Sequence, residues 1–200
     1  MAEKYAEDPQ EKKSSWKETV VLYLHDAVYL LITVLLLFLL VFRIVVVSGD
    51  SMKRTLVDGD YLLLLNNVFY QEPKCGDVVV ISKDSFDNGA PIVKRVIATE
   101  GQYVDIDFEQ GIVYVDGTAI EEVYINNPTN HNWGTNFPLV VADNCIFALG
   151  DNRAVSRDSR DPVIGQIDKR EVLGKALFLF LPGTDKAQTS RDFARIGVIK

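Results

Sequence analysis

The sequence AVYLLITVLLLFLLVF, residues 27–42, contains no charged side chain and divides the chain into two unlike parts. Apolar residues begin before it at Val20 and continue after it to Val47. A helix needs about 20 apolar residues to cross a bilayer, because each residue rises about 1.5 Å and the hydrocarbon core is about 30 Å thick. The run is apolar on all faces, so a helix made from it would have no side for water. It therefore predicts a transmembrane anchor over residues 20–43.

Two other interpretations of this run are a buried core helix and a cleaved signal peptide. A core helix of a small soluble domain usually has one side that faces water, and a helix made from this run would have none. A signal peptide needs a positively charged start and a cleavage site of small residues. Acidic side chains outnumber lysines before residue 27, and no A-x-A pattern follows the run. We therefore expect the anchor to be retained.

The basic residues around the run indicate its orientation. Four lysines precede it, and three basic side chains, from Arg43 to Arg54, follow it closely. By the positive-inside rule this favours a cytoplasmic N-terminal tail, residues 1–19, and an extracytoplasmic domain, residues 44–200. In such a compartment Cys75 and Cys145 can form a disulfide, and the sequence leaves this open.

The composition excludes several functional classes. The 200 residues are 48% hydrophobic and 24% charged, with a net charge of -7, and show no basic cluster. Nucleic-acid binding is driven by phosphate neutralisation, so no nucleic-acid partner is expected. Only 2 histidines and 2 cysteines are present, without CxxC spacing, so we expect no metal site. The sequence does not predict an oligomeric state.

Beyond Arg43 the pattern changes to short apolar runs separated by turn signals such as Asp-Gly and Asn-Gly. Val, Ile and Tyr enrichment between such breaks is typical of strands. We predict a mainly β fold of antiparallel sheets, as a barrel or stacked sheets, with short helices only near residues 55–56 and 169–172. The runs are IVVVS (44–48), YLLLL (61–65), DVVVIS (77–82), IVKRVIA (92–98), YVDI (103–106) and IVYV (112–115).

Ser51 and Lys94 are the candidate reactive residues. Ser51 follows Gly49 and Asp50 in a turn that can expose a hydroxyl. A serine nucleophile needs a base, but His25 lies beside the apolar run and His131 lies in the polar loop 126–136. A lysine can be the base if burial lowers its pKa. Lys94 stands within an apolar strand; the alternative is that it points out of an edge strand.

A polar segment, GDNRAVSRDSR at 150–160, lies between apolar runs and has the composition of a hydrogen-bonded loop. Within it a hydroxyl could orient a lysine. An ion pair between Asp158 and Arg160 could hold the loop.

These segments together resemble the type I signal peptidases, membrane-bound serine proteases with a Ser/Lys dyad. The resemblance covers the chain from the anchor to residue 182, and RDFARIGVI at 191–199 is similar to the tail of shorter members. Each motif alone is weak, but their order along the chain is specific. They are SGDSM at 48–52, GDVVVI at 76–81, KRVIATEG at 94–101, GDNRAVSRDSR at 150–160 and LGKALF at 173–178.

The resemblance implies a serine endopeptidase that removes signal peptides from exported preproteins at a lipid bilayer, without a metal or cofactor. It makes Ser51 the nucleophile and Lys94 the general base. It also implies that the Ser156 hydroxyl holds Lys94, while Asp158 and Arg160 support the loop.

The resemblance also implies an oxyanion hole formed by the backbone N–H of Ser51, with a serine hydroxyl in some members where this chain has Gly49. A shallow apolar pocket for small residues of the signal peptide is expected. We expect its walls at Val45, Val47, Met52 and Ile92.

Two positions depart from the family pattern. Arg54 stands where proline is usual, and Cys75 stands where arginine is usual. We expect the first change to loosen the turn after Ser51, because proline restricts φ. Self-cleaving Ser/Lys repressors would need a DNA-binding module, which residues 1–43 do not offer. A catalytically inert, membrane-tethered β-domain remains an alternative, although it leaves the ordered motifs unexplained.

Overall fold

The computed structural model describes residues 16–185 and 190–199, which form two compact units, one up to Leu39 and one from Leu40 onward. The first unit consists of most of helix α1, Trp16–Val41. This helix is long and apolar enough to cross a membrane. Its most apolar 18 residues have a mean hydropathy of 2.4, and none of them is buried. Phe42 and Arg43, which we assigned to the anchor, instead begin strand β1. The predicted tail over residues 1–19 lies outside the described residues, except for the first helical turn.

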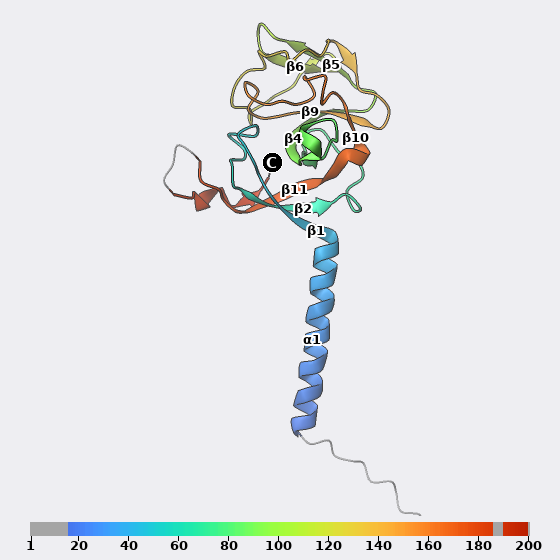
Figure 1. The fold of residues 1–200 in the computed structure, drawn as a ribbon, viewed down its shortest axis with the longest axis vertical. Helices are drawn as coiled ribbons and strands as arrows, with labels where there is room; N and C mark the ends of the chain where they lie inside the picture. The colour runs from blue at the N-terminus through green and yellow to red at the C-terminus, as the bar shows by residue number, and fades with distance from the viewer. Residues whose placement is uncertain (1–15, 186–189, 200) are drawn as a thin grey trace, which may run out of the picture. The chain divides into compact units, whose positions relative to one another are not determined.

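The second unit contains two antiparallel sheets (Figure 1). The larger sheet has eight strands in the order β1-β2-β11-β3-β4-β9-β10, with β12 paired to β11. The predicted mainly β fold is therefore confirmed. Its strands are β1 (Phe42–Val46), β2 (Tyr61–Asn66), β3 (Val78–Ile81), β4 (Ile92–Thr99), β9 (Cys145–Leu149), β10 (Ile167–Asp168), β11 (Val172–Leu181) and β12 (Gly197–Val198).

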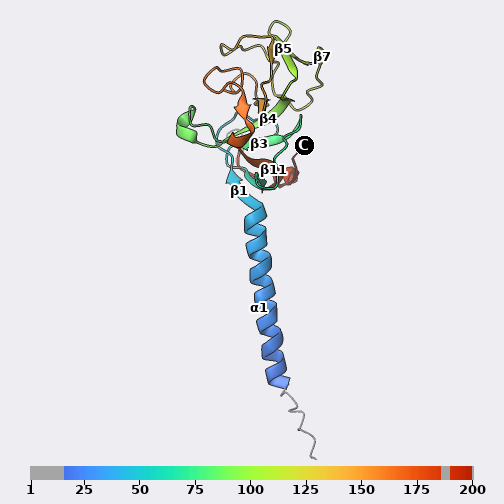
Figure 2. The same cartoon turned by 90° about the vertical axis from the view of Figure 1, so that its right-hand side faces the viewer.

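The smaller sheet has four strands in the order β7-β6-β5-β8. Two views of the second unit place this sheet at one end and β1 and β2 at the other, with β4 between them (Figure 1 and Figure 2). Of the helices predicted here, only that near residue 169 forms. The strands are β5 (Tyr103–Asp107), β6 (Ile112–Val115), β7 (Thr118–Ala119) and β8 (Leu139–Val140); the 3-10 turns are Asp87–Gly89, Lys169–Glu171 and Phe193–Arg195.

Continuous apolar runs form strands covered on both faces. Every residue of β3 is buried, and six of the eight residues of β4 are buried. Because β4 pairs with β3 on one side and β9 on the other, it is an interior strand. The alternative in which Lys94 projects from an edge strand is therefore wrong.

Candidate active site

The turn after β1 places Ser51 at the surface, above buried apolar side chains. Met52 and Leu56 are 0% and 1% exposed, and the amide of Leu56 donates to the carbonyl of Met52 at 2.8 Å. Gly49 has a φ of +85°, and its N–H donates to Asp58 Oδ1 at 2.8 Å. The two apolar side chains thus anchor a tight turn that leaves Ser51 half-buried at its start.

Lys94 reaches this serine from β4. Its Nζ lies 3.0 Å from Ser51 Oγ and donates to the carbonyl oxygen of Val93 at 3.0 Å. The side chain is 2% exposed, and burial lowers the pKa of Lys94 to about 8. The nearby carboxylates of Asp158 and Asp151 oppose this shift by favouring the ammonium form. The two residues selected from the sequence are therefore in hydrogen-bonding distance, with the amine partly neutral near pH 8.

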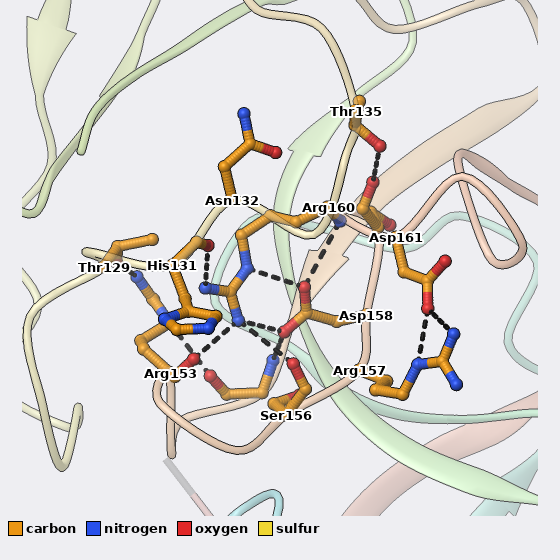
Figure 3. Close-up of polar contacts among 12 residues, drawn as sticks. Thr129, His131, Asn132, Thr135, Arg153, Ser156, Arg157, Asp158, Arg160 and Asp161 are labelled. Atoms are coloured by element: carbon orange, nitrogen blue, oxygen red, sulfur yellow. Dashed lines mark hydrogen bonds and ion pairs between the residues drawn. The ribbon is translucent and has the colours of Figure 1, made fainter.

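The polar segment 150–161 is a hydrogen-bonded loop that is buried except for exposed residues at Ala154, Val155 and Arg157 (Figure 3). Asp158 and Arg160 are both 0% exposed, and their ion pair, Nε to Oδ1 at 2.9 Å, is present as the sequence suggested. Asp158 Oδ2 also accepts the N–H of Gly150 at 3.0 Å. Arg160 Nη1 donates to the carbonyl of His131, so this loop also holds the segment 126–136. The histidine side chain itself is exposed.

Gly150 brings this loop against the turn that contains Ser51. A Cβ at this position would lie 2.1 Å from Ser156 Oγ and 2.5 Å from the carbonyl oxygen of Ser51. No side chain larger than hydrogen fits there without displacing backbone. The glycine thus allows Ser51 and Ser156 to approach each other.

Ser156 does not make the contact that the resemblance implies. Its Oγ is buried, and it has no hydrogen-bond partner among the described residues, Lys94 included. The lysine Nζ turns to the carbonyl oxygen of Val93 instead. The expected Ser156–Lys94 hydrogen bond is therefore missing from this structure.

Asn152 and Arg95 are site residues that sequence reasoning missed. Asn152 holds the turn twice: its Nδ2 donates to the carbonyl of Asp50 at 3.0 Å, and its N–H donates to that of Ser51 at 3.0 Å. Arg95 forms a buried ion pair with Asp151, Nη2 to Oδ2 at 2.7 Å. The available signal was an arginine inside an apolar strand, since such a cation must find a carboxylate.

The predicted pocket residues divide between two apolar clusters. Val47 and Met52 belong to one cluster, and Val45 packs against it. Ile92 packs against a different cluster, while its neighbour Val93 joins the first. Successive strand residues face opposite sides, so Val93 is the residue of β4 that shares a cluster with the other three, and Ile92 lies in the other cluster.

Residues 20–181 match the model of the family described as signal peptidase, peptidase S26. The chain belongs to this family. It is 36% identical over 146 residues to the "Probable signal peptidase I-1" of Synechocystis sp., covering 69% of this chain and 70% of that protein. It is 30% identical over 188 residues to the signal peptidase I of Bacillus licheniformis, covering 90% and 98%. A crystal structure of a signal peptidase I from Enterococcus faecalis aligns with a TM-score of 0.42 at 28% identity, over 52% of this chain and 96% of that one.

Membership of the signal peptidase family makes the protein a serine peptidase, a hydrolase of peptide bonds. The family is membrane-associated, which is compatible with the apolar helix at the N-terminus. Among the described residues, no group of three His, Cys, Asp or Glu side chains could hold a metal ion.

The two departures from the family pattern have different structural settings. Arg54 has a φ of +90°, and its Nη1 donates to the carbonyl of Ile125 at 2.8 Å. Proline is restricted to φ near −65°, so the turn has a conformation that proline cannot take. The structure does not test whether the turn is looser than one with proline, and that effect stays a prediction. Cys75 is an exposed free thiol and Cys145 is also free, so the structure contains no disulfide between them.

Proposed function

We propose that this chain is a membrane-anchored serine endopeptidase that removes signal peptides from exported preproteins, with Ser51 as the nucleophile and Lys94 as the general base. The observation that carries the proposal is the 3.0 Å separation between Ser51 Oγ and a buried lysine amine whose pKa is lowered to about 8. A neutral amine at this distance can accept a hydroxyl proton, which an ammonium cannot do.

The reaction follows from this pair. Neutral Lys94 accepts the proton of Ser51 as Oγ attacks the scissile carbonyl carbon, and the carbonyl electron pair moves onto its oxygen. The resulting ammonium then donates its proton to the leaving amine as the peptide bond breaks. Water attacks the acyl-enzyme ester with Lys94 again as base, which releases the acid product and restores Ser51.

The backbone N–H of Ser51 is the proposed oxyanion donor. It donates to no described residue, so it is not engaged in a hydrogen bond within the described part of the chain. Gly49 provides no second hydroxyl. Loss of one oxyanion donor costs about 10²–10³ in kcat in other serine proteases, so the remaining donor must be well aimed.

Ser156, Asp158 and Arg160 are proposed as supporting residues. Their contacts reach the reactive pair through Gly150, whose N–H binds the buried Asp158 carboxylate. The apolar side chains of Val45, Val47, Met52 and Val93 are proposed as the wall against which small residues of the signal peptide pack.

Helix α1 is proposed to anchor the enzyme with its N-terminus in the cytoplasm and residues 44–200 outside it. An anchored enzyme finds an apolar signal peptide by diffusion within the plane of the membrane, so the search has two dimensions instead of three. Cys75, an exposed thiol, offers a test. A membrane-impermeant maleimide should label intact cells expressing the full chain, and a Cys75→Ser variant should lose most labelling. Labelling only after cell lysis would contradict this orientation.

The catalytic proposal is tested with the full chain in detergent micelles and a preprotein whose cleavage site has alanine at the minus-three and minus-one positions. Wild type should cleave after the alanine, while Ser51→Ala and Lys94→Ala should each lower the rate by at least about 10³-fold, with unchanged thermal unfolding. An inert membrane-tethered domain would leave the preprotein intact in all three samples. Full activity of the lysine variant would exclude the dyad.

A further inference from the structure

Asn152 connects the buried loop to the peptide groups on both sides of Ser51. Its side-chain Nδ2 donates to the carbonyl of Asp50, and its backbone N–H donates to the carbonyl of Ser51, each at 3.0 Å. The residue is 6% exposed, so water competes little for these bonds. Two consecutive peptide groups of the turn are thus held by one residue.

The first of these bonds acts on the peptide group that joins Asp50 to Ser51. A trans peptide is planar, so the carbonyl of Asp50 and the N–H of Ser51 point in opposite directions within one rigid unit. A donor that fixes the carbonyl therefore fixes the direction of the N–H. A hydrogen bond to the carbonyl also polarises the N–H and strengthens it as a donor.

The Asn152 amide is itself oriented by a neighbour. Asn126 Nδ2 donates to Asn152 Oδ1 at 3.3 Å, and the Asn126 N–H donates to the carbonyl of Asp151 at 2.8 Å. Because Oδ1 of Asn152 accepts from Asn126, Nδ2 of Asn152 points to the carbonyl of Asp50. The segment 126–136, a polar loop of no assigned role in the sequence, thereby supports the nucleophile turn.

We propose that Asn152 is a positioning residue that aims the Ser51 N–H at the oxyanion of the tetrahedral intermediate. This inference rests on the proposed function, because it assigns a role within that reaction. Gly49 increases the dependence on this single N–H, since it brings no hydroxyl to the site. Asn152 touches neither the substrate nor the reacting atoms, and it acts through the Asp50–Ser51 peptide.

The test replaces Asn152 with Leu, which has a similar shape but no donor, and with Ala, in the full chain in detergent micelles. Misplacing one group by about 1 Å can cost about 100-fold in rate. We expect kcat to fall about 10- to 100-fold while KM changes less than about twofold. The rising limb of the pH profile should stay near pH 8, because the surroundings of Lys94 are kept. Asn67→Leu is the control, since that side chain makes no hydrogen bond to a described residue.

A second measurement reports the oxyanion directly. A signal-peptide-derived aldehyde ending in alaninal forms a bond between Ser51 Oγ and its carbonyl carbon, the carbonyl electron pair moves onto oxygen, and the serine proton passes to Lys94. The matched peptide amide binds without this step. Asn152→Leu should weaken aldehyde inhibition by the same factor as kcat/KM and leave the amide affinity unchanged. Equal weakening of both inhibitors, or an unchanged kcat, would overturn the inference.

Asn126→Ala provides a variant at an exposed position in case both Asn152 variants fail to fold. It removes the bonds from Nδ2 to Asn152 Oδ1 and to Asn127 Oδ1. Loss of the first bond should lower kcat about 2- to 5-fold with KM unchanged, because one weak neutral hydrogen bond to the Asn152 amide is lost. A wild-type kcat in this folded variant would then overturn the inference. Absence of cleavage by wild type would refute the proposed function itself, whereas cleavage by wild type with full activity of the variants would refute only the role of Asn152.

Discussion

Lys94 and Arg95 are adjacent cations on β4, 2% and 1% exposed, yet their surroundings differ. Lys94 Nζ contacts neutral oxygens, those of Ser51 and Val93, and no described carboxylate lies within salt-bridge distance. Arg95 faces the opposite side of the strand and binds both carboxylate oxygens of Asp151, at 2.9 Å and 2.7 Å. Its Cζ also lies 4.0 Å from the centre of the Tyr124 ring.

The difference separates the lysine proposed as the base from an arginine that only forms an ion pair. Burial without a paired carboxylate penalises the ammonium, so the pKa of Lys94 falls into the range of a useful base. Burial with a bidentate carboxylate keeps Arg95 charged and ties β4 to the loop that begins at Gly150. In the proposed mechanism Lys94 serves the chemistry, whereas Arg95 holds the fold together.

The largest expected effect tests this contrast through stability. Arg95→Met should lower the free energy of unfolding by about 3–5 kcal/mol, because it leaves Asp151 buried without its cation. Lys94→Met should leave that free energy unchanged or raise it, since no ion pair is lost. Urea unfolding of the two variants beside wild type measures both. A similar loss in the two variants would refute the distinction.

A smaller effect is expected at the ion pair that joins the C-terminal segment to the segment just after Ser51. Arg195 Nη2 lies 2.6 Å from Oδ2 of Asp60, which is 0% exposed, and also donates to the carbonyl of Thr55. Arg195→Ala should lower the free energy of unfolding by about 1–2 kcal/mol, which is less than for Arg95→Met. Arg195 is partly exposed, and backbone N–H groups still bind the Asp60 carboxylate. The conservative variant Arg195→Lys should recover part of this loss in the same urea experiment.

The pH dependence of cleavage tests the reactive side of the comparison. The folded-state pKa of Lys94 is lowered to about 8, so the active neutral form is lost as pH falls and gained as pH rises through that value. At pH 7 the rate should be about a tenth of its plateau, which corresponds to about 1.4 kcal/mol. A profile of kcat/KM between pH 6 and pH 10 measures this, taken at pH values where wild type stays folded. A rate independent of pH in this interval would contradict a lysine base.

The smallest effect is expected at Arg54, a cation that is neither the proposed base nor part of a buried ion pair. Arg54 is exposed, has a φ of +90° and binds only the carbonyl of Ile125 among the described residues. Arg54→Gly should change stability by less than about 1 kcal/mol, since relief of backbone strain offsets one exposed hydrogen bond. Arg54→Pro should be clearly less stable, because proline cannot adopt this φ. Thermal unfolding distinguishes the two variants.

Several elements were predictable because their signals are local. The runs at 61–65, 92–98 and 112–115 became strands β2, β4 and β6, since short apolar runs and the turn residues that bound them are signals within a few positions. The long strand β11 was not among the predicted runs, although its residues 176–181 are apolar without interruption. The length and position of this strand depend on its pairing with β2 and β3, which lie far from it in the sequence.

The sequence by itself determined the apolar helix, the mainly β domain and the choice of Ser51 and Lys94, because hydrophobic pattern, turn chemistry and a shortage of histidine are written along the chain. Tertiary structure alone decided that Lys94 meets Ser51 at 3.0 Å, that Arg95 pairs with Asp151, and that Ser156 stays unbonded to the lysine among the described residues. Those outcomes depend on which residues distant in sequence are packed together. The pKa of a buried group follows from its neighbours and not from its own identity.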